Sequence, residues 1–319
     1  MNLMDIYQEL KDDITAIEQE LYRSIDSNYA LISETSSHLL KAGGKRIRPV
    51  FVLLGGKSGA YDIERLKHVA VALELIHMAT LVHDDVIDNA ETRRGKPTVK
   101  AKWDNRVAMY TGDFILAQAL ARVTHLANPR VHQILSKAMV DMCVGEIEQI
   151  QALYQWNQSL KTYFMRIKRK TALLIAVSCQ LGGLVCDAPE RVVHALYRYG
   201  YYVGMAFQIT DDILDFTGSE QQLGKPAGSD LRQGNITLPV LASFKDPAIR
   251  EKIISEFKSG TPDMPKIINL IKQSGGIAVA KTIAQRYLEK ARQSLEDLQA
   301  VYSKKTLIKI TDFIEQRTY

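Results

Sequence analysis

Apolar residues recur along this chain with helical spacing. One stripe near the N-terminus advances in steps of three or four residues, through Ile6, Leu10, Ile14, Ile17, Leu21 and Ile25. A second stripe does the same through Leu66, Val69, Ala70, Leu73, His77, Thr80 and Leu81. Such steps place side chains on one face of an α-helix, and strand-like alternation is nearly absent. The pattern therefore predicts an all-α protein.

Glycine and proline gather in a few short stretches that mark the expected loops. These stretches are 43–44, 55–59, 94–97, 218–234 and 260–265. Helices are expected from Ile115, Val131, Lys161 and Leu238, over 191–216, and over most of the chain after Pro265. No long polar linker divides the sequence, so we expect residues 1–319 to form a single domain.

Composition and charge narrow the possible partners. The 319 residues are 46% hydrophobic and 24% charged, with a net charge of +5. The mild basic excess forms no concentrated stripe, so a nucleic-acid partner is not expected. The uncharged run 171–186 is shorter than the roughly 20 residues that span a bilayer, and it predicts a buried core helix. Three cysteines in apolar stretches, without a CxxC pair, predict buried inert thiols and a cytoplasmic protein.

Two similar acidic motifs are the candidate chemical centre. DDVID occupies 84–88 and DDILD occupies 211–215. The first continues one helical face through Leu73, His77, Thr80, Asp84 and Asp88, with Asp85 about a quarter-turn away. The second repeats the arrangement through Gly204, Gln208, Asp211 and Asp215. Both motifs are therefore expected on the interior faces of their helices.

Carboxylates one helical turn apart repel each other by on the order of a few kcal/mol at an intermediate dielectric. A hard divalent cation removes this cost, and Mg²⁺ prefers a few carboxylates together with phosphate oxygens. The charge count of three carboxylates and one diphosphate suits about three Mg²⁺ ions. The alternative is a pair of solvated acidic helix ends, which the interior placement of both motifs disfavours.

Basic residues that suit a phosphate group accompany the two motifs. They are Lys45 and Arg48 in GGKRIRP, Arg93 and Arg94 in RRGKP, Lys170 beside Thr171, and Lys225 in a glycine-rich loop. Each has a plainer explanation: a solvated basic turn, charge compensation of the acidic motif, a snorkelling lysine, or an ordinary surface loop. His77 could likewise be a satisfied core histidine.

The ordered motifs from Gly43 to about Pro239 resemble those of the trans-prenyl diphosphate synthases, the polyprenyl synthetases. They are GGKRIRP, ELIHMATLVHDDVID, RRGKP, GDF, KT at 170–171, FQITDDILDF and GKPAGSDLRQGN. Within that family the sequence resembles the large catalytic subunit (component II) of bacterial hexaprenyl and heptaprenyl diphosphate synthases. The resemblance implies an isoprenoid-synthase-type bundle of helices around a deep central cavity.

The resemblance also implies roles for individual residues. Asp84, Asp88 and Asp211 would ligate Mg²⁺, supported by Asp85 and Asp215. The allylic diphosphate would be held by Arg93, Lys170 and Lys225, and isopentenyl diphosphate by Lys45, Arg48, His77 and Arg94. Thr171 and Gln208 would offer oxygen dipoles to a developing carbocation. The implied reaction ionises the allylic C–O bond, adds the isopentenyl double bond to the cation and releases a proton to the diphosphate.

Residue size near the first motif bears on product length. In the family, the position five residues before the first aspartate is often bulky when products are short. Here it is Ala79, and its neighbours Ile76 and Thr80 are of moderate size. We therefore expect farnesyl diphosphate to be extended to a product of about C30–C35, for a quinone side chain such as that of menaquinone.

The resemblance implies a small partner subunit in a heterodimer, or otherwise a homodimer, and at most transient membrane-surface contact for product release. Two other functions are considered. A class I terpene cyclase usually carries an NSE-type motif in place of a second DDxxD and lacks GGKRxRP. A non-catalytic partner subunit tends to lose aspartates from one motif. Both motifs are intact here, which favours the synthase.

Overall fold

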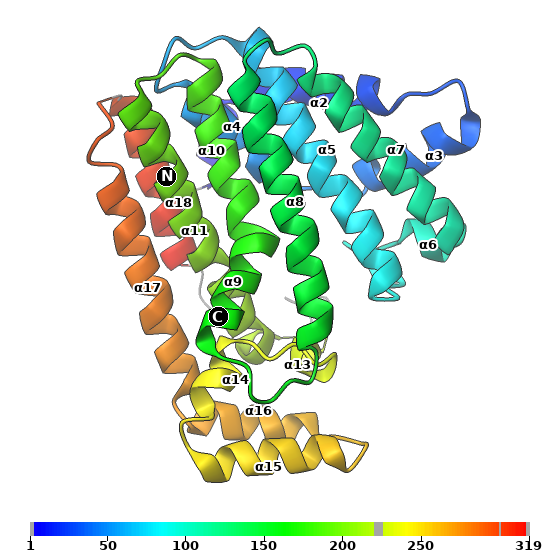
Figure 1. Ribbon diagram of the computed structural model, residues 1–319, viewed down its shortest axis with the longest axis vertical. Coiled ribbons are helices and arrows are strands. Elements are labelled where there is room, and N and C mark those ends of the chain that lie inside the picture. The colour runs from blue at the N-terminus through cyan, green and yellow to red at the C-terminus, as the bar shows by residue number, and fades with distance from the viewer. Residues whose placement is uncertain (1–2, 220–225, 300, 317–319) are drawn as a thin grey trace. The chain divides into compact units, whose positions relative to one another are not determined.

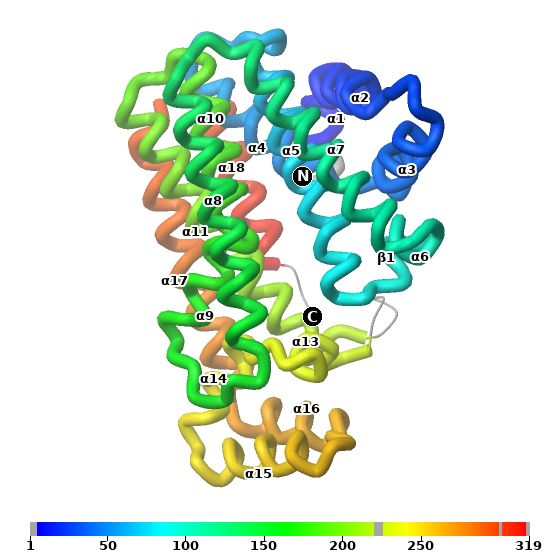
Figure 2. Tube along the Cα trace, turned by 45° about the vertical axis from the view of Figure 1, so that its right-hand side comes forward, coloured from blue at the N-terminus to red at the C-terminus, as the bar shows by residue number. Residues whose placement is uncertain are grey.

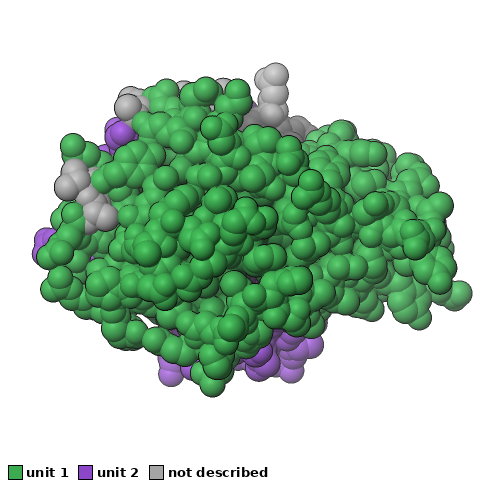
Figure 3. Space-filling view, turned by 90° about the horizontal axis from the view of Figure 1, so that it is seen from above, with its two compact units in different colours: residues 1–135, 177–197, 297–307 green, residues 136–176, 198–296, 308–319 purple. Residues whose placement is uncertain are grey.

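The computed structural model describes residues 3–219, 226–299 and 301–316. Apart from one short hairpin, the described elements are helices (Figure 1), which confirms the all-α fold class. The chain divides into two compact units, coloured separately in Figure 3: unit 1 (1–135, 177–197 and 297–307) and unit 2 (136–176, 198–296 and 308–319). That residues 1–319 form a single domain stays a prediction.

Unit 1 contains the helices of the N-terminal part of the chain, seen at the blue end of the tube in Figure 2. They are α1 (Leu3–Glu9), α2 (Lys11–Ile25), α3 (Ala30–Lys41), α4 (Ile47–Gly56), α5 (Ile63–Ile87), α6 (Val99–Lys102) and α7 (Asn105–Val123). Strands β1 (Thr92–Arg93) and β2 (Lys96–Pro97) form a hairpin between α5 and α6.

Unit 2 contains most elements of the C-terminal half. They are α9 (Leu160–Ile167), the π-helical turn η1 (Lys168–Ala172), α13 (Ser229–Arg232), α14 (Leu238–Ser243), α15 (Pro247–Lys258), α16 (Met264–Gln273) and α17 (Gly276–Ser294). Four helices contribute residues to both units: α8 (Pro129–Ala152), α10 (Leu173–Val185), α11 (Glu190–Thr217) and α18 (Val301–Glu315).

Helix α5 is the central helix of unit 1, packed against α2, α4 and α7. Its residues are buried on nearly every side between Leu66 and Ala79, as expected for a helix surrounded by others. The side chain of Asp62 caps its N-terminus by accepting from the backbone N–H groups of Glu64 and Arg65. This packing fixes the helix that ends in the first acidic motif.

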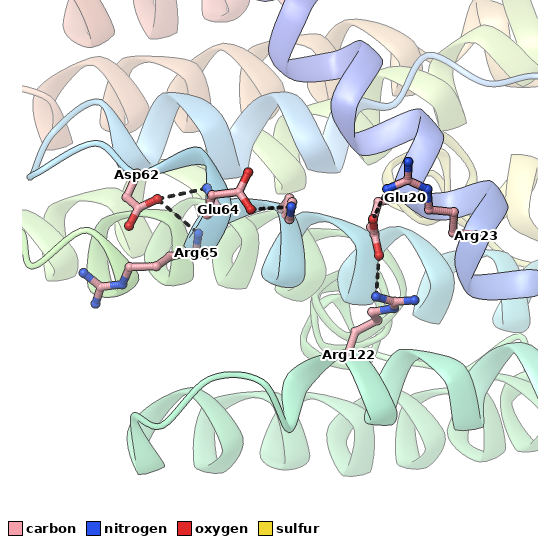
Figure 4. A network of polar contacts seen from close by, with 7 residues as sticks. Glu20, Arg23, Asp62, Glu64, Arg65 and Arg122 are labelled. Carbon is pink, nitrogen blue, oxygen red and sulfur yellow. Dashed lines mark hydrogen bonds and ion pairs between the residues drawn. The ribbon is translucent and has the colours of Figure 1, made fainter.

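The N-terminal stripe is helical, as predicted, but it is divided at Leu10 into α1 and α2. Its members Ile17, Leu21 and Ile25 are buried within the chain. Glu20 of α2 pairs with Arg23 on the same helix and with Arg122 of α7 (Figure 4). The second ion pair links α2 to α7. The amphipathic N-terminal helix therefore packs on its own core.

Three local expectations were wrong. Gly55 and Gly56 belong to α4 and not to a loop. Glycine is needed at position 55 because α10 packs closely there, and a methyl group on Gly55 would collide with the carbonyl of Cys179. The loop expected over 94–97 is the turn and second strand of the hairpin. Cys143 is exposed, whereas Cys179 and Cys186 are buried as predicted.

The uncharged run after Thr171 is the buried helix α10, as predicted, preceded by the end of η1. Among the described residues, no helix combines the length and the apolar character needed to cross a bilayer.

Candidate active site

The first acidic motif ends α5 and differs from the predicted arrangement. Asp84 is half-buried, Asp88 at the C-cap is exposed, and Asp85 is only 2% exposed. The prediction that Asp88 continues the buried face, with Asp85 turned from it, is therefore wrong. The helix ends at Ile87, so Asp88 already lies where the surrounding packing stops.

Asp85 is buried because the hairpin supplies its counter-charge. Arg93 of β1 places Nε 2.8 Å and Nη2 2.7 Å from Asp85 Oδ1. The turn residues Arg94 and Gly95 both have positive φ, which is typical of a two-residue hairpin turn. This geometry holds Arg93 against α5, where it pairs with Asp85. A contact between Arg93 and the allylic diphosphate stays a prediction.

The basic loop before α4 contains a buried arginine that sequence reasoning missed. Arg46 has a left-handed backbone, with φ +45°, and is 7% exposed. Its guanidinium pairs with Glu18 of α2 and lies 3.3 Å from Glu74 Oε1 of α5. Glu74 is itself 3% exposed, so this ion pair fixes the loop on the core. The sequence did contain a sign of this ion pair. Glu74 lies at a buried position of a predicted helix, and a buried carboxylate needs a partner.

Arg48, the second residue of α4, lies in a different environment. It is half-buried, and its Nε atom has no hydrogen-bond partner among the described residues. Burial lowers the pKa of Arg48 to about 10, against the attraction of Glu74. An arginine nitrogen buried without an acceptor is costly, and an anion would satisfy it.

Arg94 and His77 lie in the same electrostatic environment as Arg48. Burial, followed by the nearby arginines, lowers the pKa of His77 well below its usual value, so the imidazole is neutral. The arginines responsible are Arg48, Arg94, Arg93 and Arg46. Gly44 leaves the space in which the Arg94 guanidinium lies, since a methyl group there would be 2.7 Å from its Nη1.

The structure thus brings together three of the four residues predicted to hold isopentenyl diphosphate: Arg48, His77 and Arg94. The fourth, Lys45, is exposed, and its carbonyl accepts a hydrogen bond from Tyr7 of α1. Its side chain is on the short loop that contains Arg46 and leads into α4, to which Arg48 belongs. We call the two arginines Arg48 and Arg94 the cationic group of unit 1, beside which neutral His77 lies.

The second acidic motif ends α11 in unit 2. Asp211 is half-buried, whereas Asp212 and Asp215 are 3% and 1% exposed. Asp215 accepts from the backbone N–H of Asp230, and its carbonyl accepts from Gly228. The interior placement predicted for Asp215 is confirmed. Its contacts fix the segment that leads into α13.

Asp212, which sequence reasoning passed over, is the centre of a buried hydrogen-bond chain. Its carboxylate accepts from Tyr163 Oη at 2.6 Å and from Gln208 Nε2 at 2.9 Å. Gln208 Oε1 in turn accepts from Thr171 Oγ1 at 2.5 Å. Burial raises the pKa of Asp212 to about 7, although both donors oppose the shift. The spacing of four residues between Gln208 and Asp212 was the sequence feature that could have predicted their contact.

Thr171 and Lys170 lie on the π-helical turn η1. Such turns interrupt regular helices and are frequent at functional sites. Gly204 of α11 lets this turn come close, because a methyl group there would be 2.5 Å from Ala172 Cα. Lys170 is exposed, with Nζ 3.2 Å from Gln149 Oε1 and 3.7 Å from Glu146 Oε2. Lys225, predicted to hold the allylic diphosphate, is outside the described residues.

The carboxylates predicted to bind metal fit Mg²⁺ by their chemistry. Asp84, Asp88 and Asp211 offer hard oxygen donors at half-buried or exposed positions. Among the described residues, no three His, Cys, Asp or Glu side chains are grouped to hold an ion by themselves. Mg²⁺ commonly takes only one or two carboxylates and completes its shell with water and phosphate oxygens.

Known proteins resemble this chain over its whole length. The Polyprenyl synthetase family model matches residues 29–273. Heptaprenyl diphosphate synthase component 2 of Geobacillus stearothermophilus is 54% identical, and the match covers 100% of both chains. Among solved structures, heptaprenyl diphosphate synthase from Staphylococcus aureus is 40% identical with a TM-score of 0.91, covering 97% of this chain and 99% of that one.

A geranylgeranyl pyrophosphate synthase from Lactobacillus brevis also has a TM-score of 0.91, at 31% identity and 99% coverage of each chain. The isoprenoid-synthase-type fold expected from the motifs is therefore confirmed. The ordered motifs, the helical fold and the family match agree, and the chain belongs to the polyprenyl synthetase family.

Proposed function

We propose that the chain condenses isopentenyl diphosphate head to tail with an allylic diphosphate, and that the reaction requires Mg²⁺. Family membership and the names of the relatives support an elongating prenyl synthase. One observation supports the choice of reaction. Unit 1 has, besides its acidic motif, a cationic group in which a buried guanidinium nitrogen finds no acceptor in the part of the chain that the structure describes. A terpene cyclase uses one diphosphate, whereas a condensing enzyme must also hold a second.

The residues would divide the work between the two substrates. Arg48, Arg94 and neutral His77 would bind isopentenyl diphosphate, with Lys45 at the exposed edge of the loop. Lys170 and Lys225 would hold the allylic diphosphate, and Arg93 would contribute if diphosphate competes with Asp85. Asp84, Asp88 and Asp211 would ligate Mg²⁺, which when bound withdraws negative charge from the leaving diphosphate.

Thr171 would stabilise the positive charge that develops on the allylic carbon. Its hydroxyl proton is donated to Gln208, so its lone pairs are directed elsewhere. Oxygen dipoles already oriented toward a developing charge lower the barrier without reorganisation. The released diphosphate is the natural acceptor of the proton lost after condensation.

We propose farnesyl diphosphate as the primer and a product of about C30–C35. Ala79 and Ile76 are buried in α5, where no aromatic side chain occupies the turn before the acidic motif. Two relatives named heptaprenyl diphosphate synthase support this length, although the geranylgeranyl synthase shares the fold. Residue size and the names of these two relatives therefore support a long product, and the fold does not.

A condensation assay tests the proposal. The chain is incubated with farnesyl diphosphate, labelled isopentenyl diphosphate and Mg²⁺, with and without a candidate small subunit of the same organism. We expect labelled products that reach about C30–C35 when the subunit is present. No condensation in either mixture would exclude the synthase. A C15 or C20 end product would exclude the long-chain assignment alone.

We also propose that an exposed stripe on α8 binds the small partner subunit. Val140, Val144, Ile147 and Ile150 are 63%, 41%, 58% and 47% exposed and follow one helical face. Cys143 lies on the same face and is exposed. Relatives named component 2 imply another component, and a contiguous apolar surface of this kind marks a protein contact.

Substitution of Ile147 by aspartate should abolish association with the small subunit, because it places a charge in the middle of the stripe. Sedimentation velocity of the mixed chains measures the loss. Gln285→Asp, at an exposed position of α17, is the control and should leave association unchanged. Association that survives in Ile147→Asp, or a stripe that mediates self-association only, would contradict the assignment.

A further inference from the structure

A chain of hydrogen bonds in unit 2 runs from the apolar core to Thr171. It leads from Tyr163 on α9 through Asp212 and Gln208 on α11 to Thr171 on η1. We propose that Tyr163 and Asp212 are positioning residues that act through Gln208 to fix the direction of the Thr171 hydroxyl. The inference rests on the proposed function, which places Thr171 beside the reacting allylic carbon.

The donors and acceptors determine the direction of every bond in this chain. The NH₂ group of Gln208 donates to Asp212, so the amide oxygen of Gln208 faces Thr171. The two ends of a carboxamide are nearly the same size, and therefore their partners decide its orientation. The oxygen of Gln208 then accepts the Thr171 proton. Asp212 thus determines that Thr171 presents lone pairs, and not its proton, to its remaining surroundings.

Packing keeps the inner end of the chain immobile. Tyr163 is 0% exposed and lies in an apolar cluster with Ile167, Met205 and Ile209. The guanidinium of Arg166 lies 5.5 Å from its ring centre and donates to the carbonyl of Ile236. Both Asp212 oxygens accept from protein side chains, so this carboxylate is held from two sides.

The arrangement separates binding from catalysis. Charged groups would supply the affinity for the two diphosphates, whereas the Thr171 dipole matters once positive charge develops. Loosening the chain should therefore lower kcat and leave both KM values nearly unchanged. Substitution of a residue that only supported the fold would not lower kcat alone, and its effect would not vanish when Thr171 is also replaced.

A double-mutant cycle on kcat tests the relay in the full-length chain, combined with its small subunit. Tyr163→Phe keeps the ring and removes one donor to Asp212, and should lower kcat roughly tenfold, less than outright removal of a preorganised dipole. Thr171→Val removes the hydroxyl and should lower kcat by about 10²-fold. In the Thr171→Val background, Tyr163→Phe should have no further effect. Effects that multiply would overturn the proposal.

Two further variants separate positioning from packing. Asp212→Asn keeps an acceptor for Gln208 and should retain more activity than Asp212→Leu, which keeps none. Tyr287→Phe is the matched control, because Tyr287 packs on the same apolar cluster from α17 and is not a member of the chain of hydrogen bonds, and its kcat should not change. Equal losses in Asp212→Asn and Asp212→Leu, or a comparable loss in Tyr287→Phe, would indicate packing alone and overturn the proposal.

Unfolding measurements test the network without turnover. Tyr163→Phe and Gln208→Leu share Asp212 as their partner, so their effects on the free energy of unfolding should be coupled and not additive. This result is expected whether or not the chain condenses prenyl substrates, so an inactive wild-type protein would refute the proposed function separately. Additive effects would show that Asp212 does not link the two residues and would overturn the proposal.

Discussion

Replacing Asp84 by alanine should lower turnover by at least ~10³-fold, because several kcal/mol of metal-mediated charge stabilisation would be lost. The helical fold should persist, since Asp84 is half-buried and α5 is held by the apolar residues of its preceding turns. Steady-state turnover and the far-ultraviolet circular dichroism spectrum measure the two effects.

Glu64→Ala is the matched control for this substitution. Glu64 is an exposed carboxylate at the other end of α5, where it pairs with Lys67. Its removal should change turnover by less than twofold, since exposed ion pairs contribute little. More than a tenth of wild-type turnover in Asp84→Ala would contradict the assignment of Asp84 as a metal ligand.

The second large effect should come from Arg48→Gln. The KM for isopentenyl diphosphate should rise about 10- to 100-fold, because charge-assisted hydrogen bonds to a phosphate contribute roughly 1.5–3 kcal/mol. The KM for the allylic diphosphate should stay within about twofold of wild type, since a different set of residues holds it. Initial-rate measurements at varied concentrations of each substrate separate the two constants.

Arg46→Gln, two residues away, should instead destabilise the fold. It leaves Glu74 buried without its counter-charge, which typically costs about 3–5 kcal/mol. Urea denaturation measures this loss. An unchanged free energy of unfolding in Arg46→Gln, or an equal rise of both KM values in Arg48→Gln, would contradict the division between a structural and a substrate-binding arginine.

Helical spacing was sufficient to predict much of the fold and the elements that carry the site. The stripe through Leu73 correctly placed the first acidic motif at the end of a buried helix, and Asp215 lies inside as its spacing required. The apolar helix expected after the basic loop is present, but it begins at Ile47, inside GGKRIRP. These features depend on local periodicity, which a single sequence contains.

Contacts made by other elements decided what spacing alone could not. Asp85 is buried in place of Asp88 because Arg93 returns from a hairpin turn formed by Arg94 and Gly95. Arg46 points inward because its backbone is left-handed, a conformation that non-glycine residues adopt uncommonly. Neither the hairpin nor this backbone geometry leaves a helical pattern in the sequence.

The buried role of Asp212 was missed for a related reason. Spacing placed it beside the predicted ligand Asp211, but of its two donors Gln208 lies on the same helix and Tyr163 comes from another. Tyr163 reaches Asp212 from α9, and the π-helical turn after α9 brings Thr171 to Gln208. Such a turn departs from the 3.6-residue period on which the sequence argument relied.

Dependence of turnover on free Mg²⁺ is the most direct test of the central claim, that the aspartates serve metal-dependent condensation of two diphosphates. Labelled isopentenyl incorporation would be measured at saturating substrates while free Mg²⁺ is titrated from an EDTA-treated preparation. We expect no incorporation in EDTA and a saturable rise as Mg²⁺ is added. Incorporation that proceeds undiminished in EDTA would contradict it.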